Sequence, residues 1–256
     1  AADAANGEEL WVTDGTSAGT QMVRDIATGF VGSTPGSLTI YNGLLYFFAS
    51  TTTYGRELWV TDGTSANTQV IKDLNPGPGA GAYTYPYTAV YGGKLYFAGD
   101  NGTSGTELFA TDGTTAGTVL VSNINSFGSS LPADFYVYKN KLYFNADDGT
   151  NGRELWVTDG SNTTMLADLN PGAGDGSPSV FYNYKGNLYF GATRSSAPDY
   201  NFYKSDGTAA GTVLIAPTIA PNINPVADAV GFFLNTTNNT LYVRANYNSN
   251  GLEMWA

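Results

Sequence analysis

The chain lacks cysteine and histidine altogether and has few basic residues. Its 256 residues include 11 Lys and Arg against 22 Asp and Glu, which gives a formal net charge of −11. Without His or Cys there is no Ser-His-Asp triad, no imidazole or thiolate metal site, no thiol nucleophile and no disulfide. Nucleic acids and anionic membranes bind clustered basic charge, so neither is expected as a partner.

Long apolar runs are missing as well. No run approaches the roughly 20 residues of a membrane helix, so membrane insertion is not expected. The chain is 42% hydrophobic and 14% aromatic with 32 Gly, which is too apolar for disorder and too rich in Gly for a helical protein. The first residues, AADAANG, contain no initiator Met and suit cleavage after export. We therefore expect an all-β protein, extracellular or at the cell surface of a bacterium or archaeon.

The chain does contain an internal repeat. A Glu-Leu-Trp segment followed by Thr-Asp-Gly-Thr recurs along it, with a Leu-Tyr-Phe series between the copies. The copies begin at Glu9, Glu57, Glu107 and Glu154, with a decayed copy at Asn201 and a final one at Glu253. The 244 residues from the first to the last Glu make five intervals of about 49, within the range of propeller blades.

Each repeat contains four short strands separated by Gly, Asn and Asp turns. In one repeat we expect them at 135–138, 141–145, 153–158 and 163–168. The second and third strands are apolar on both faces, as required of a sheet that lies between two others. The sequence predicts a β-propeller, a single domain over residues 1–256 with five blades of four antiparallel strands, one blade being closed by strands from both termini.

The stretch ELWVTDGTSAGT, residues 9–20, resembles the bacterial ELWxxDGT-repeat family. The resemblance covers nearly the whole chain, although the fourth repeat has Asn201 and Lys204 where Glu and Val are expected. It implies an extracellular β-propeller, and it brings no established catalytic or binding residue to this chain.

The aspartates of the Asp-Gly-Thr segments could form a ring of cation ligands, but we interpret them as structural. An Asp side chain bonds the backbone N–H two residues on, and the following Gly supplies a positive φ. Such turns resemble the Asp-box turns of sialidase propellers. These aspartates are Asp14, Asp62, Asp112, Asp159 and Asp206.

The Glu of the repeat accounts for five of the six Glu residues. Two carboxylates at a suitable distance could hydrolyse a glycoside, but the first strands, nearest the axis, carry only Asp134 and Asp228. Hairpin register places Glu9 opposite Arg24, and the next Glu opposite Lys72, so cross-strand ion pairs are expected. The chain is predicted not to be an enzyme, and a propeller-type glycoside hydrolase or lyase is the less favoured alternative.

The loops on one face, between the second and third strands, are rich in oxygen ligands of the kind that Ca²⁺ takes. The candidates are Asp100, Asp147, Asp148 and Asn151. No loop has EF-hand spacing, so Ca²⁺ is a candidate cofactor and no other cofactor is expected.

Aromatic residues lie in the linkers after the fourth strands. Such rings stack on sugars, and the alternative is that they cover the mouth of the propeller tunnel. The candidate ligand-binding residues are Tyr83, Tyr85, Tyr87, Phe30 and Phe127.

These features predict a non-catalytic extracellular binding or adhesion module that recognises a carbohydrate through the linker face. A glycan or another surface protein is its expected partner. The alternative is a structural scaffold subunit of a cell-surface or filamentous assembly. Residues 250–256 repeat the third strand already present at 7–13, and a surplus strand of this kind supports self-assembly by strand exchange.

Overall fold

The fold is all-β. A computed structural model describes residues 1–82, 87–193, 200–215, 231–235, 239–246 and 252–255. These residues form strands, turns and loops but no helix, and every pair of neighbouring strands is antiparallel. This part of the chain contains no helix with the length and apolar composition needed to cross a membrane. The all-β prediction is confirmed.

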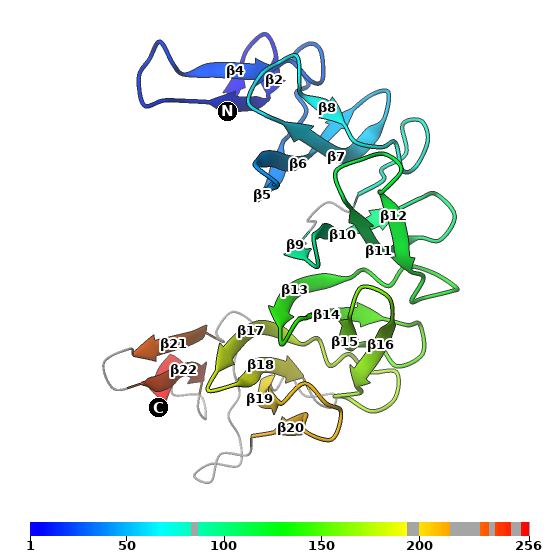
Figure 1. Ribbon diagram of the computed structural model, residues 1–256, viewed down its shortest axis with the longest axis vertical. Coiled ribbons are helices and arrows are strands. Elements are labelled where there is room, and N and C mark those ends of the chain that lie inside the picture. The colour runs from blue at the N-terminus through cyan, green and yellow to red at the C-terminus, as the bar shows by residue number, and fades with distance from the viewer. Residues whose placement is uncertain (83–86, 194–199, 216–230, 236–238, 247–251, 256) are drawn as a thin grey trace. The chain divides into compact units, whose positions relative to one another are not determined.

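The chain divides into two compact units, Ala1–Leu131 (unit 1) and Pro132–Ala256 (unit 2). Unit 1 contains two two-stranded and two four-stranded sheets (Figure 1). Its strands are β1 (Ala2–Asp3) with β2 (Gly7–Glu8), β3 (Leu10–Val12) with β4 (Gln21–Arg24), then β5 (Gly36–Tyr41), β6 (Leu44–Thr51), β7 (Gly55–Thr61) and β8 (Gln69–Val70), and finally β9 (Thr88–Tyr91), β10 (Lys94–Asp100), β11 (Thr106–Thr111) and β12 (Val119–Ser122). The predicted single domain stays a prediction.

Unit 2 contains two four-stranded sheets and one three-stranded sheet among its described residues. Its strands are β13 (Ala133–Tyr138), β14 (Lys141–Asp147), β15 (Arg153–Thr158) and β16 (Thr163–Ala167), then β17 (Ser179–Tyr184), β18 (Asn187–Thr193), β19 (Tyr200–Ser205) and β20 (Val213–Leu214), and finally β21 (Gly231–Asn235), β22 (Thr240–Asn246) and β23 (Leu252–Trp255). Each four-stranded sheet follows the chain order, so each is one sequence repeat. The predicted repeat of four antiparallel strands is confirmed.

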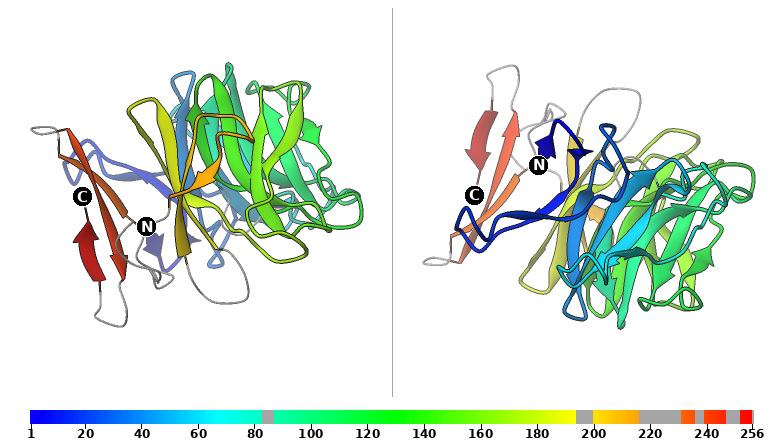
Figure 2. Two further views of the ribbon diagram at one scale, coloured as in Figure 1. Left: turned by 90° about the horizontal axis from the view of Figure 1, so that it is seen from below. Right: turned by 90° about the horizontal axis from the view of Figure 1, so that it is seen from above.

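The second and third strands of a repeat are covered on both faces. In β6 the consecutive residues Phe47 and Phe48 are both fully buried. Phe47 packs with Leu10 and Trp59 in the cluster shared with β3–β4, whereas Phe48 packs with Phe97 in the cluster shared with β9–β12. The sheets β5–β8 and β9–β12 therefore lie face against face, as their neighbouring blue-to-cyan and green strands in Figure 2 illustrate.

Tyrosines at the ends of the first strands link neighbouring sheets within each unit. The Tyr41 hydroxyl donates to the Gly93 carbonyl in the next sheet at 2.5 Å. Tyr138 and Tyr184 donate in the same way to the carbonyls of Gly186 and Asn239. Since each acceptor lies in or beside the turn between the first two strands of the next repeat, these bonds fix the spacing between sheets.

At the end of unit 2, β22 pairs with β21 on one edge and β23 on the other. The second copy of the third strand therefore takes the place predicted for the N-terminal copy, and β3 pairs only with β4 among the described residues. Closure of one sheet by strands from both termini is thus not seen. The physical reason is that only residues 247–251 separate β22 from β23, so bringing these strands together loses little chain entropy.

Candidate functional site

The Asp-Gly-Thr aspartates lie in hairpin turns and use their carboxylates there. Asp112 Oδ1 accepts from the Thr114 amide at 2.9 Å and from the Thr114 hydroxyl at 2.7 Å. The turns at Asp14, Asp62 and Asp206 repeat both bonds at the same distances, and Asp159 accepts from the Ser161 and Asn162 amides. These hydrogen bonds lower the pKa of each carboxyl.

The four candidate calcium ligands also bond within their own loops. Asp100 and Asp147 each accept from the glycine amide two residues on. Asp148 accepts from the Thr150 and Asn151 amides and from the Asn151 side chain. In the described part of the chain no three acidic side chains are grouped closely enough to hold a metal ion. The calcium site stays a prediction.

The candidate sugar-binding aromatics belong to unit 1 where they are described. Phe127 is 99% exposed, Phe30 is 81% exposed and Tyr87 is half exposed. Tyr83 and Tyr85 lie outside the described residues.

The glutamates of the repeat differ from the prediction. Arg24 lies opposite Leu10, and the register shifts by one residue immediately after it, between Leu10 and Trp11. The extra residue lies in β4, so Arg24 is opposite Leu10 and not opposite Glu9, and the predicted ion pair is wrong. Arg24 and Lys72 instead reach across to carbonyl groups of the next sheet.

The four glutamates Glu9, Glu57, Glu107 and Glu154 are buried, and each holds the linker that leaves its own repeat. Glu9 accepts from the amides of Ala27 and Ser33 at 3.0 Å and from the Ser33 hydroxyl at 2.5 Å. Glu107 accepts in the same way from the Ser130 amide and hydroxyl. Charge-assisted bonds to amides are among the stronger hydrogen bonds. The glutamates are therefore linker anchors.

In the other two repeats glycine replaces this serine. Gly176 donates its amide to Glu154 at 2.9 Å. A Cβ added at Gly81 would lie 2.1 Å from the nearest Glu57 oxygen. Glu57 Oε2 is buried and has no hydrogen-bond partner among the described residues.

Glu57 and Glu154, the anchors that face a glycine instead of a serine, have raised pKa values. Burial, with a smaller contribution from the charge of Asp73, raises the pKa of Glu57 to about 8. Burial and the charge of Asp168 raise the pKa of Glu154 to about 7. Backbone amides oppose both shifts because they favour the ionised form.

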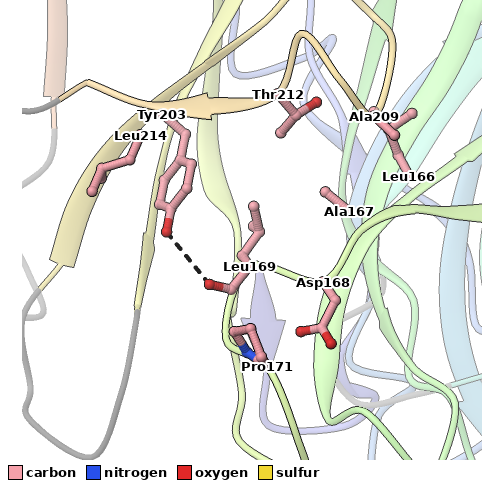
Figure 3. Close-up of a pocket in the computed structure, with 9 residues that line it drawn as sticks. All are labelled: Leu166, Ala167, Asp168, Leu169, Pro171, Tyr203, Ala209, Thr212 and Leu214. Atoms are coloured by element: carbon pink, nitrogen blue, oxygen red, sulfur yellow. Dashed lines mark hydrogen bonds between the residues drawn. The ribbon is translucent and has the colours of Figure 1, made fainter.

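A cavity of about 460 Å³ in unit 2 lies beside Asp168, the acid whose charge acts on Glu154 (Figure 3). It lies between the end of β16 with its following linker and the strands β19 and β20 with their connecting turn. Its nine lining residues are Leu166, Ala167, Asp168, Leu169, Pro171, Tyr203, Ala209, Thr212 and Leu214.

Two polar side chains define the chemistry of this cavity. Asp168 is its one charged lining residue, and the Asp168 Oδ1 atom is buried with no hydrogen-bond partner among the described residues. Tyr203 donates to the Leu169 carbonyl at 3.5 Å, and its ring stacks on Phe190 with centroids 5.5 Å apart. An apolar wall with one carboxylate and one phenol can bind and orient a small organic molecule.

Sequence reasoning missed the cavity. The signal was the decayed repeat, in which Tyr203 stands at the position that Trp occupies in four other copies. Asp168 was visible as an acid at the end of a fourth strand, but the space beside it depends on small residues in a neighbouring sheet.

No family model and no curated protein sequence matches this chain. Solved structures do resemble it. A prolyl endopeptidase is 15% identical with a TM-score of 0.50, over 91% of this chain and 34% of that one. Puromycin hydrolase is 13% identical with a TM-score of 0.49, over 89% and 35%. An endo-arabinase from Bacteroides thetaiotaomicron is 13% identical with a TM-score of 0.36, over 87% and 92%. The chain spans about a third of the length of the first two proteins.

These likenesses are propeller-like in fold, and at 13 to 15% identity they show fold alone. The prediction of a non-catalytic carbohydrate-binding or adhesion module, with a scaffold as its alternative, is contradicted by these comparisons: the prolyl endopeptidase, whose fold resembles that of this chain, is an enzyme. They do not test catalysis in this chain, so the prediction that it is not an enzyme stays a prediction.

Proposed function

We propose that unit 2 binds a small organic molecule in the cavity beside Asp168. The observation that carries the proposal is a cavity of about 460 Å³ that combines apolar side chains with one carboxylate and one tyrosine hydroxyl. Small-molecule sites share the size of this cavity and its combination of apolar walls with a few placed polar groups.

We also propose the wider setting of this site. The repeat count and the four-stranded sheets support a five-bladed β-propeller of the ELWxxDGT-repeat type. The absence of Cys and the acidic composition are compatible with an exported protein. Self-association through residues 250–256 remains a separate hypothesis.

Blocking the cavity tests the proposed site. Ala209 lines the cavity and is exposed in the turn between β19 and β20, whereas its neighbour Ala210 is exposed but does not line it. A fragment library is screened against the wild type by ligand-observed NMR. We expect fragments that bind the wild type to be lost in Ala209→Trp and kept in Ala210→Trp. If no bound fragment is sensitive to Ala209→Trp, the cavity is not a binding site.

A further inference from the structure

We infer that the cavity takes a short organic cation, an alkylammonium or alkylguanidinium ion, in the place where unit 1 has a lysine or arginine side chain. This inference rests on the proposed function, because it names the chemical class that the same cavity binds. Its basis is a comparison of equivalent positions in the repeats.

In the first two repeats of unit 1 a basic side chain, two residues after the strand partner of the tryptophan, bridges neighbouring sheets; the third repeat has Ser122 there. The Lys72 ammonium donates to the Thr118 carbonyl in the next sheet at 2.7 Å. The Arg24 guanidinium donates to the Thr68 carbonyl in the sheet that follows its own. Both acceptor threonines are equivalent, since each ends the connection that begins with Asp-Gly-Thr. Two successive gaps between sheets are thus crossed by a cation on an aliphatic stem.

Ala167 occupies the equivalent position in unit 2. Trp59 pairs with Val70 and Trp156 pairs with Met165, so Lys72 and Ala167 each lie two residues after the partner of the tryptophan. Thr212 corresponds to Thr118 and lines the cavity together with Ala167. The aliphatic stem and charge that cross the gap in unit 1 are therefore missing where the cavity lies.

A second truncation enlarges the same space. In unit 1 the Thr115 hydroxyl donates to the Ile71 carbonyl at 2.7 Å. The equivalent of Thr115 in unit 2 is Ala209, which lines the cavity, and the equivalent of Ile71 is Leu166. The Thr118 and Ile71 carbonyls accept these hydrogen bonds in unit 1. The carbonyls of the equivalent residues in unit 2, Thr212 and Leu166, could accept hydrogen bonds from a ligand in the cavity.

The charges around the cavity favour a cation. Asp168 lies in its wall, no Lys or Arg is among the nine lining residues, and the buried carboxyl of Glu154 lies close enough to Asp168 to respond to its charge. An ammonium group beside Asp168 would be paired with a carboxylate, and the Tyr203 ring offers an aromatic surface of the kind that attracts cations. An anion would be repelled by Asp168, and no basic residue lines the cavity to offset that repulsion.

Three compounds with the same carbon chain separate charge from shape: n-butylammonium, n-butanol and butanoate. Isothermal titration calorimetry at low ionic strength and pH 7 measures their binding to the full chain. We expect n-butylammonium to bind at least tenfold more tightly than n-butanol, and butanoate not to bind.

Two variants locate the interaction. Ala167→Lys should occupy the cavity with the chain's own cation, which raises the melting temperature and abolishes n-butylammonium binding, whereas the neutral Ala167→Met should stabilise less. Asp168→Asn should weaken n-butylammonium binding at least tenfold and leave n-butanol unchanged. Asp73→Asn, at the equivalent position in unit 1, is the matched control and should bind like the wild type.

Equal binding of n-butylammonium and n-butanol would refute the cation while leaving the cavity as a ligand site. Binding of n-butylammonium that survives both Ala167→Lys and Asp168→Asn would place the cation elsewhere and also refute the inference. If none of the three compounds binds, the alkyl cation is wrong, and the fragment screen with Ala209→Trp decides separately whether the cavity binds any other molecule.

Discussion

The buried glutamate of each repeat is the residue whose role departs most from its sequence pattern. A Glu two positions before Trp in a hairpin strand suggests an exposed cross-strand pair, yet Glu57 is fully buried and holds a linker. The difference arises from the irregular register seen after Leu10, Leu108 and Leu155. In each case the fourth strand contains one extra residue, so the residue expected opposite the glutamate is displaced along that strand. No residue type in the strand predicts this bulge.

Glu57→Gln should flatten the pH dependence of stability. Because the pKa of Glu57 is about 8 when folded and near 4.5 otherwise, the folded state holds a proton that the unfolded state releases. The contribution of this bound proton to the stability of the folded state is fully present below about pH 4.5 and is lost as the pH rises through 8. Each unit of pKa shift corresponds to about 1.4 kcal/mol. We expect the melting temperature of the wild type to fall from pH 5 to 8, and that of the variant to fall less.

Glu8→Gln is the control for this experiment, since Glu8 is exposed beside an anchor glutamate. It should follow the wild-type profile. Parallel profiles for wild type and Glu57→Gln would mean that Glu57 ionises equally in both states.

Ser130→Ala tests the serine-type anchor. Removing the hydroxyl deletes the 2.5 Å bond to Glu107 and leaves a buried carboxylate with one donor fewer, which should lower the free energy of unfolding by about 1–2 kcal/mol. Urea denaturation followed by tryptophan fluorescence measures the change. Ser126→Ala, exposed in the same linker, should have no effect, and an equal loss in both variants would contradict a specific anchor.

At the scale of elements the sequence predicts well, because the signals are local. In the repeat β13–β16 the third strand matches the expected 153–158, and the second extends two residues beyond the expected end. Alternating apolar residues and Gly or Asn turns determine these strands without help from distant contacts. The cavity is different, since it depends on Ala167 and Ala209 meeting across two sheets.

Glycines of the Asp-Gly-Thr turns allow a matched test of packing between elements. Gly63 and Gly113 have the same φ of 95°, but a Cβ on Gly113 would lie 2.5 Å from the Tyr46 hydroxyl oxygen, whereas one on Gly63 would touch nothing within 4 Å. Both Gly→Ala variants should be destabilised by the strain of positive φ, by about 1 kcal/mol. Gly113→Ala should lose roughly 1 kcal/mol more from the clash.

Denaturant unfolding of both variants provides the measurement, and Tyr46→Phe provides the check. Combined with Gly113→Ala, it should recover most of the additional loss, because the hydroxyl is the atom in the way. Equal destabilisation at Gly63 and Gly113 would mean that the hairpin moves freely relative to the neighbouring sheet.

For the whole molecule, two copies of the third strand compete for one edge. Glu9-Leu10-Trp11 and Glu253-Met254-Trp255 are alternative partners for β22, and the propeller prediction favours the N-terminal copy. The structure pairs β22 with the C-terminal copy, with Ala245 opposite Glu253. In the first four-stranded sheet the equivalent pair is Ala49 with Glu57, so Glu9 would lie opposite Ala245 if the N-terminal strand closed the sheet.

Because the chain contains no cysteine, cross-linking can distinguish these pairings without background. Directly opposed residues on antiparallel strands lie about 4.5–5.5 Å apart, within disulfide range. Under mild oxidation, Ala245→Cys with Glu253→Cys should form an intramolecular disulfide, and Ala245→Cys with Glu9→Cys should not. Peptide mapping without reduction identifies the bond, and light scattering separates monomers from dimers. A disulfide between residues 245 and 9 within one chain would show closure by both termini, whereas a 245–253 bond joining two chains would show that the last strand is exchanged between copies.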